Sequence, residues 1–232
     1  MSDNKSKDIY EHGLRSMFDP DCILQVRILM LMAVVNDITT AISHYQDYSL
    51  NAVKYREKDE VEELFLGARS NYFFKLACAH TFEAVKLLGT FIDGEDVKEI
   101  VKDFSDRGKD AHERLIRNSR EDSRLFKYLV RLRNNLSFHY DEGAFKKALD
   151  AYGYDHRTQM IAGETVADYR FIAADDVQAQ IISSVVPKDE TKSAFHDIAQ
   201  LQGDIIGFLH KFMSKYYHIK IEKTDNIFRI KR

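Results

Sequence analysis

Proline and glycine, the residues that most often interrupt regular secondary structure, are scarce in this chain. Its 232 residues include only two prolines, Pro20 and Pro187, and ten glycines. A protein built from many strands and tight turns needs more of both, because turns use the fixed φ of proline and the permissive backbone of glycine. The sequence therefore predicts long helices.

The size and composition are typical of a soluble globular protein. The chain of 27.0 kDa is 44% hydrophobic and 31% charged, which is enough apolar material for a sizeable core. Its formal net charge of −3 argues against coating nucleic acid by bulk charge, although a local basic patch remains open. Without an internal repeat or a low-complexity linker, we expect one helical domain over residues 1–218 and a basic tail over 219–232.

The cysteines and the N-terminal segment favour a cytoplasmic protein. Cys22 and Cys78 lie in apolar helical patterns and lack the spacing of a metal-binding or redox pair. The first residues are polar and do not resemble a signal peptide. The most apolar run, residues 28–35, is far shorter than the roughly 20 residues of a membrane span. We interpret it as a buried helix and expect no membrane contact.

Hydrophobic residues recur at three- and four-residue steps through most of the chain, which predicts an all-α bundle of long antiparallel helices. A short strand or extended loop is expected within residues 160–172. The predicted helices cover about 21–48, 59–91, 95–118 as one helix or two broken near Gly108, a helix from Ser119 onward, 144–152, a helix from about Asp175, and 188–217.

The helix predicted from Ser119 has a start signal and an apolar face. Ser119 is followed three residues later by Asp122, which resembles a capping box. Four leucines at steps of four, three and four residues then share one face of the helix, so this face is expected to pack on the core. They are Leu125, Leu129, Leu132 and Leu136.

The segment over residues 131–141 carries the groups best suited to chemistry on phosphates. Arg133 has the planar donors that bind phosphate oxygens, and His139, with an ordinary pKa of about 6.5, can exchange a proton near neutral pH. Asn134 would orient the phosphate or the imidazole. These groups suit metal-independent RNA cleavage, in which the ribose 2′-hydroxyl attacks the adjacent phosphate.

These residues resemble the signature of the HEPN superfamily. That signature is an arginine followed by a polar residue and then, after a gap of four to six residues, a histidine near a helix end. Arg133, Asn134 and His139 match it with five intervening residues. Residues 73–88 are similar to an earlier core helix of the superfamily. The resemblance implies a helical bundle of HEPN type and a homodimer whose two chains form one composite active site.

The same resemblance implies an activity and a setting. The implied activity is that of a metal-independent endoribonuclease. The implied setting is prokaryotic toxin–antitoxin or antiviral defence, with an antitoxin or a nucleotidyltransferase as a further partner. The tyrosine that such a transferase modifies lies two residues after the histidine, whereas Tyr140 directly follows His139. Tyr140 is therefore open to two other roles, stacking on a base or packing.

Helix geometry limits how the motif can assemble. Six residues at about 100° each place Arg133 and His139 roughly 120° apart on an ideal helix. Asn135 and His139, four residues apart, share a face. Arg133 reaches the same cleft only if the helix ends near Phe138 or if the partner chain completes the site.

Basic residues concentrate beside the motif. By direct count, residues 107–133 hold nine Lys or Arg against four Asp or Glu. Four of them recur at helical steps away from the leucine face, where an RNA backbone would lie. The alternative is a solvated face balanced by neighbouring acids. The four residues are Arg120, Arg124, Lys127 and Arg131.

His80 and Glu83 lie one helical turn apart in an apolar context. They could be metal ligands, a polar pair in the core or a support for His139, and we favour the core or supporting role. A ferritin-like metal site would need the Glu-x-x-His pattern on several helices, and that pattern is missing. Because the sequence also lacks a glycine-rich phosphate loop, we expect neither metal nor cofactor.

A second interpretation keeps the fold and discards the catalysis. In it, the protein is a non-catalytic HEPN-like scaffold that binds a nucleotide, RNA or a protein partner through the same cleft. A third interpretation is a helical interaction protein whose match to the motif is accidental.

Overall fold

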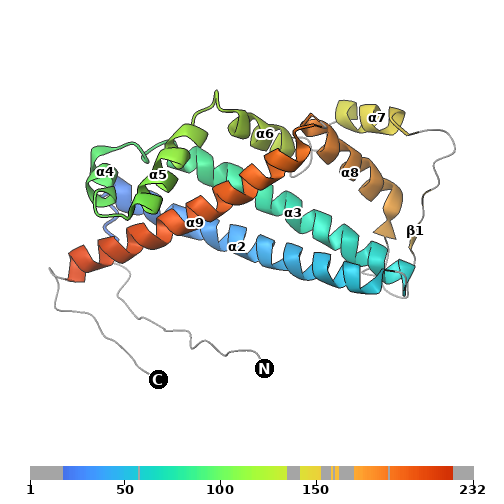
Figure 1. Ribbon diagram of the computed structural model, residues 1–232, viewed down its shortest axis with the longest axis horizontal. Helices are drawn as coiled ribbons and strands as arrows, with labels where there is room; N and C mark the ends of the chain where they lie inside the picture. Colours follow the sequence, from blue (N-terminus) through green and yellow to red (C-terminus); the bar gives the residue numbers. More distant parts are fainter. Residues whose placement is uncertain are drawn as a thin grey trace, which may run out of the picture.

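The computed structural model describes residues 18–56, 58–134, 142–152, 158, 160–161, 170–187 and 189–221. These residues form an all-α helical bundle, as predicted, with two very short strands (Figure 1). The elements in chain order are α2 (Ile23–Tyr55), α3 (Glu60–Leu88), α4 (Glu95–Val101), α5 (Asp106–Asn118), α6 (Arg124–Leu132), α7 (Glu142–Asp150), β1 (Met160–Ile161), β2 (Arg170–Phe171), α8 (Ile172–Val185) and α9 (Thr191–Ile221).

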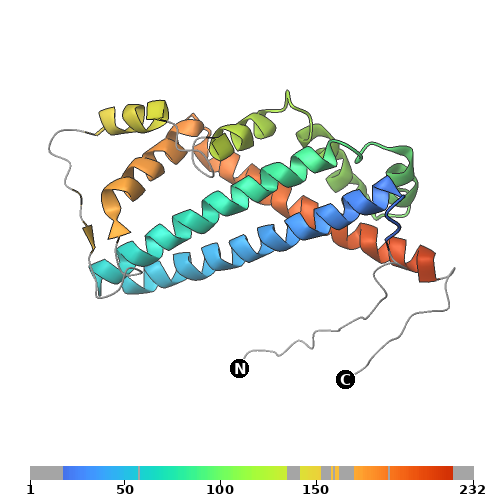
Figure 2. The same ribbon diagram turned by 180° about the vertical axis from the view of Figure 1, so that it is seen from behind.

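The long helices α2 and α3 form an antiparallel hairpin and lie side by side along their lengths (Figures 1 and 2). The second helix begins at a defined cap, because the side chain of Asp59 accepts a hydrogen bond from the backbone N–H of Glu62 at 3.1 Å. Glu60, Glu62 and Glu63 in its first turn complement the positive end of the helix dipole. The predicted range 59–91 is therefore close to the helix observed.

Helix α9 crosses this hairpin and organises the rest of the bundle. It packs most extensively on α5, and α6 packs on α3 (Figure 1). The inner face of α9 is deeply buried, with Ile205, Phe208 and Phe212 each at most 2% exposed. Burial of one such side chain contributes about 1.5–3 kcal/mol, so this face is a major source of stability. Because α9 continues to Ile221, the first residues of the predicted tail are helical.

Strands β1 and β2 pair antiparallel, with Met160 opposite Phe171 and Ile161 opposite Arg170. Residues 160–161 and 170–171, near the two ends of the range 160–172 in which an extended segment was expected, are therefore strands. Residues 162–169 lie outside the described residues. Helix α8 begins directly after β2, three residues before Asp175, which falls in its first turn.

The predicted start of α6 is wrong. Ser119 closes α5 instead, because its hydroxyl donates to the carbonyl of Ile116 at 3.0 Å. The cap of α6 is Ser123, whose side chain accepts from the N–H of Phe126 at 3.1 Å. Arg120 consequently lies in the turn before α6 and not on the helix.

The break expected near Gly108 is also misplaced. Residues 95–118 do form two helices, but the interruption covers 102–105 and Gly108 lies buried inside α5. A Cβ at this position would come within 3.0 Å of both the Phe104 Cβ and the Lys211 Nζ. The glycine therefore leaves room for the Phe104 side chain just before α5, and does not end a helix.

The leucine face of α6 packs as predicted. Leu125, Leu129 and Leu132 are at most 7% exposed, and Leu136 lies outside the described residues. Phe126 on the same helix meets Phe82 of α3 edge to face, with ring centroids 5.5 Å apart. This contact positions the start of α6 against α3.

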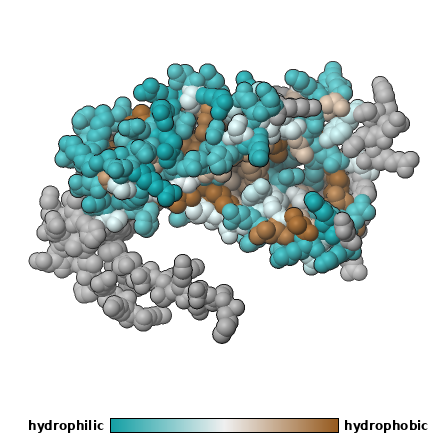
Figure 3. Space-filling view, viewed as in Figure 1, coloured by the Kyte–Doolittle hydropathy of each residue, from teal (hydrophilic) through white to brown (hydrophobic). Residues whose placement is uncertain are grey.

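Helix α2 is less buried than its apolar run predicts. Ile28, Leu31 and Val35 are in the core, but Leu29 is 38% and Met30 52% exposed. By length and composition alone α2 could cross a membrane, a property that core helices of soluble proteins share. In the space-filling view, hydrophobic surface appears in patches along the α2 side, while the surface over α4 and α5 is mostly hydrophilic (Figure 3).

Candidate functional site

The end of α6 presents Arg133 and Asn134 in a π-helical turn that directly follows Leu132. Turns of this kind occur disproportionately at functional sites, because the widened backbone redirects the side chains. Arg133 is half-buried and Asn134 is exposed. Of the other residues predicted for this site, Asn135, His139 and Tyr140 lie outside the described residues.

Arg133 is positioned by two consecutive residues of α3. Its guanidinium carbon lies 5.6 Å from the centroid of the Phe82 ring, a cation–π arrangement. Its Nε is 3.6 Å from the Oε1 of Glu83, and its Nη1 donates to the Oδ1 of Asn134 at 3.2 Å. The structure thus brings together three residues predicted for the site, Arg133, Asn134 and Glu83.

The contact between Arg133 and Glu83 is an ion pair without a hydrogen bond. The Arg133 Nε is buried and has no hydrogen-bond partner among the described residues, and its distance of 3.6 Å to Glu83 is too long for a hydrogen bond. The two side chains are 33% and 41% exposed, so water screens their attraction. The guanidinium is therefore held in place by weak contacts, and the exposed third of the Arg133 side chain makes it accessible to another anion.

His80 lies one turn before Glu83 on α3 but has a different partner. Its Nδ1 is 3.7 Å from the Oδ2 of Asp37 on α2, with the side chains 28% and 58% exposed. This pair sits at the surface of the hairpin, outside the core. Within the described residues, no group of three or more His, Cys, Asp or Glu side chains is arranged to hold a metal ion.

The four basic residues beside the motif are all exposed, but they differ in their partners. Arg124 contacts Glu190 at 3.2 Å and Asp197 at 2.9 Å, so its charge is balanced and it ties α6 to the start of α9. The remaining three form no ion pair with another described residue, which leaves their charges available. They are Arg120, Lys127 and Arg131.

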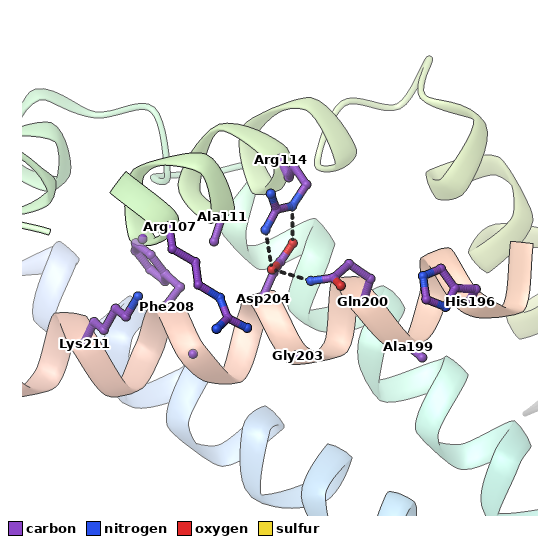
Figure 4. Close-up of a pocket in the computed structure, with 12 residues that line it drawn as sticks. Arg107, Ala111, Arg114, His196, Ala199, Gln200, Gly203, Asp204, Phe208 and Lys211 are labelled. Atoms are coloured by element: carbon purple, nitrogen blue, oxygen red, sulfur yellow. Dashed lines mark hydrogen bonds and ion pairs between the residues drawn. The ribbon is translucent and has the colours of Figure 1, made fainter. Parts of the chain in front are cut away.

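A second polar cluster, between α5 and α9, escaped the sequence analysis. Arg114 donates to Asp204 through Nε at 2.8 Å and Nη2 at 2.9 Å, and Gln200 donates to the same carboxylate at 2.9 Å (Figure 4). These hydrogen bonds raise the pKa of Arg114. Asp204 is only 6% exposed. The available signal was a carboxylate between Leu201 and Ile205, both inner residues of α9.

The pair of Arg114 and Asp204 borders a groove, which we call the α5–α9 groove. Its volume is about 580 Å³, and its walls include Arg107, His196 and Lys211. None of these residues contacts Arg133, so the molecule holds two separate polar sites.

Comparison of the chain with models of known protein families, with curated proteins and with solved structures finds no match. The functional conclusion therefore depends on the residues themselves.

Proposed function

We propose that the protein is a metal-independent endoribonuclease of HEPN type, in which Arg133 binds the scissile phosphate and His139 acts as general acid and base. Asn134 orients the phosphate, and two chains form the composite cleft as a homodimer. The ribose 2′-hydroxyl loses its proton to His139 and attacks the phosphorus. The bond to the 5′-oxygen of the next nucleotide breaks, that oxygen takes up a proton, and a 2′,3′-cyclic phosphate remains.

The main support for this proposal is the set of contacts made by the Arg133 guanidinium, together with its exposure. The guanidinium is oriented by Phe82 and Asn134, belongs to a side chain that is 33% exposed, and forms an ion pair but no hydrogen bond with Glu83. The scissile phosphodiester presents two non-bridging oxygens that share one negative charge, and the planar donors of arginine bind such a pair of oxygens bidentately.

The surface charge around α6 supports the same substrate. Lys127 and Arg131 are exposed on the helix that ends at Arg133, and neither is balanced by a described acidic side chain. Contacts of this kind position a nucleic acid backbone without reading its sequence. Arg124 contributes less, because Glu190 and Asp197 already neutralise it.

A non-catalytic HEPN-like scaffold is the second candidate, and the ion pair with Glu83 favours it. The Glu83 carboxylate lies 3.6 Å from the Arg133 Nε and gives this arginine an ion-pair partner within the chain, which suits a structural role of Arg133 at the cleft. A scaffold of this kind would bind RNA, a nucleotide or a protein through the cleft and would cleave nothing.

Cleavage in EDTA separates the two candidates. Purified protein is incubated with labelled tRNA and structured RNA, and the fragment ends are analysed. For the nuclease we expect 2′,3′-cyclic phosphate ends from the wild type and a loss of at least about 100-fold in His139→Ala and Arg133→Ala. Both variants should keep the circular dichroism spectrum and the oligomeric state of the wild type.

Matched controls come from the same chain. His210 is exposed on α9, and His210→Ala should cleave like the wild type. Arg56 forms an exposed pair with Glu63 at 3.2 Å, so Arg56→Ala removes a comparable Arg–Glu contact far along the hairpin. Equal cleavage by His139→Ala and wild type would contradict the assigned role of His139. Binding of RNA without cleavage by folded wild-type dimers would favour the scaffold.

A further inference from the structure

The α5–α9 groove has the size and shape of a small-ligand site. Its volume of about 580 Å³ falls within the range of roughly 300–1,000 Å³ that is typical of such sites. It opens to solvent between two helices that pack directly on each other. In the close-up, Arg107 extends from α5 toward α9, and the nitrogen of Lys211 points from α9 toward α5 (Figure 4).

The groove has an excess of positive charge. Arg114 is neutralised by Asp204, which is its bidentate partner at 2.8 and 2.9 Å. Arg107 and Lys211 form no ion pair or side-chain hydrogen bond with another described residue, although the protein as a whole is acidic. Arg107 is exposed and Lys211 is half-buried. Two unpaired cations therefore face one cavity, which is an arrangement that attracts an anion.

The floor of the groove is open because α9 carries glycines there. A Cβ built on Gly203 or on Gly207 would meet no atom within 4 Å, so packing inside this chain does not require glycine at either position. Glycine in a helix interior lowers stability relative to alanine. What the two glycines provide is space, which lets a ligand approach the backbone of α9.

We propose that the α5–α9 groove binds the phosphate chain of a small molecule, such as an inorganic oligophosphate or the phosphates of a nucleotide. Arg107 and Lys211 bind the phosphate oxygens, the arginine through its planar donors and the lysine as a point charge. Asp204 holds Arg114 in a fixed orientation at the wall, and His196 borders the far end of the groove, where the remainder of a nucleotide would lie.

Electrostatics argues for this ligand over a second copy of the chain. In a symmetric dimer across the groove, the same surface patch meets itself, so the unpaired cations of both copies would be brought together. That repulsion opposes association, whereas a phosphate chain neutralises both cations. The site shares no residue with the proposed nuclease site and does not depend on it.

The test uses sodium tripolyphosphate and ATP as probes, titrated calorimetrically into the full-length protein at low ionic strength. We expect binding that weakens as salt is raised, and at least a 10-fold loss of affinity in Lys211→Gln and in Arg107→Gln. The matched control is Lys215→Gln, one turn away on α9, where the lysine already contacts Asp103 at 3.9 Å. That variant should bind like the wild type.

A second pair of variants separates occupancy of the groove from folding. Gly207→Ala should raise the melting temperature by about 1–4 °C and weaken tripolyphosphate binding, because the added methyl occupies the floor. Gly67→Ala on α3, where a Cβ also meets no atom within 4 Å, should raise the melting temperature and leave binding unchanged. Opposite changes in stability and affinity cannot arise from a misfolded variant.

Three results would overturn the proposal. These are no binding of either probe to the wild type, binding unaffected by Lys211→Gln and Arg107→Gln, and binding of an RNA oligonucleotide through these residues without binding of tripolyphosphate or ATP. The last result would make the groove an RNA surface. If Arg133→Ala abolishes RNA cleavage but leaves tripolyphosphate affinity unchanged, the two sites are independent. If the wild type does not cleave RNA, the proposed nuclease activity is contradicted, and the test of tripolyphosphate binding in the α5–α9 groove is unaffected.

Discussion

Arg114 and Arg133 each contact a carboxylate on another helix, and they do so in opposite ways. Arg114 makes two hydrogen bonds to Asp204, which is 6% exposed and also accepts from Gln200. Arg133 makes none to Glu83, which is 41% exposed and 3.6 Å away, and the Arg133 Nε has no hydrogen-bond partner among the residues that the structure describes.

The difference follows from burial. A carboxylate that folding removes from water must recover its hydrogen bonds inside the protein, so Asp204 is satisfied by several donors. Glu83 keeps its contact with water and gains little from a closer bond to Arg133. The first pair is therefore a structural element between α5 and α9. The second leaves an arginine that another anion can bind.

Arg114→Ala should have the largest effect on stability. It leaves the buried Asp204 carboxylate with Gln200 as its remaining side-chain donor, and we expect a loss of about 2–3 kcal/mol in the free energy of unfolding, reduced from the fully buried case by water that reaches the exposed third of Arg114. Urea denaturation measures it. Arg107→Ala on the same helix is the control and should change stability by less than about 0.5 kcal/mol. Equal effects of the two variants would contradict the structural role of the pair.

Cys78 of α3 is buried, so it extends the comparison between buried and exposed polar groups to a thiol. Burial raises the pKa of this thiol from 9.0 to about 12. Above pH 9 the unfolded chain loses the thiol proton and the folded chain keeps it, so the contribution of Cys78 to stability is full below pH 9 and falls as the pH rises toward 12. The expected slope is about 1.4 kcal/mol per pH unit, or roughly 2 kcal/mol by pH 10.5.

The measurement is urea denaturation of the wild type and Cys78→Ala between pH 8 and 10.5. At pH 8 the free energy of unfolding of Cys78→Ala should be lower than that of the wild type, because the substitution creates a cavity. As the pH rises, the variant should lack the part of the decline in stability that comes from the thiol. Identical slopes for the wild type and Cys78→Ala would show that the thiol is not sealed.

Arg133→Ala should lower stability by no more than about 1 kcal/mol, because both its ion pair and its cation–π contact are partly exposed. Its effect on RNA binding or cleavage should be far larger than its effect on folding. Thermal unfolding and the cleavage assay, run on the same preparation, compare the two. A stability loss as large as that of Arg114→Ala would make Arg133 a structural residue.

Glu83→Gln should have the smallest effect on folding, below about 0.5 kcal/mol. Removing the competing negative charge should tighten RNA binding by a few-fold, measured by fluorescence anisotropy at low salt. Glu63→Gln makes the same chemical change in the same helix, next to Arg56, and should leave RNA affinity unchanged. Weaker binding by Glu83→Gln would mean that Glu83 holds Arg133 in its working position.

The helices themselves could be predicted from local sequence, because hydrophobic spacing and caps act within a few residues. The apolar steps of α3 led to nearly the observed bounds. The same local reasoning failed at Ser119, which resembles a helix cap in the sequence. Ser119 ends one helix and Ser123 begins the next. Hydrogen bonds to Ile116 and Phe126 decided between them.

The sequence by itself determined the all-α class, the apolar faces, and Arg133 with Asn134 at the end of a helix. It could not determine that Glu83 would lie beside Arg133, or that Arg114 would meet Asp204 from 90 residues away. Such contacts depend on how α3 packs on α6 and α5 on α9, which is settled by shape and volume across the whole core. Spacing along one helix carries no information about the helix that packs against it, so only the tertiary structure decided which arginine is locked and which is available.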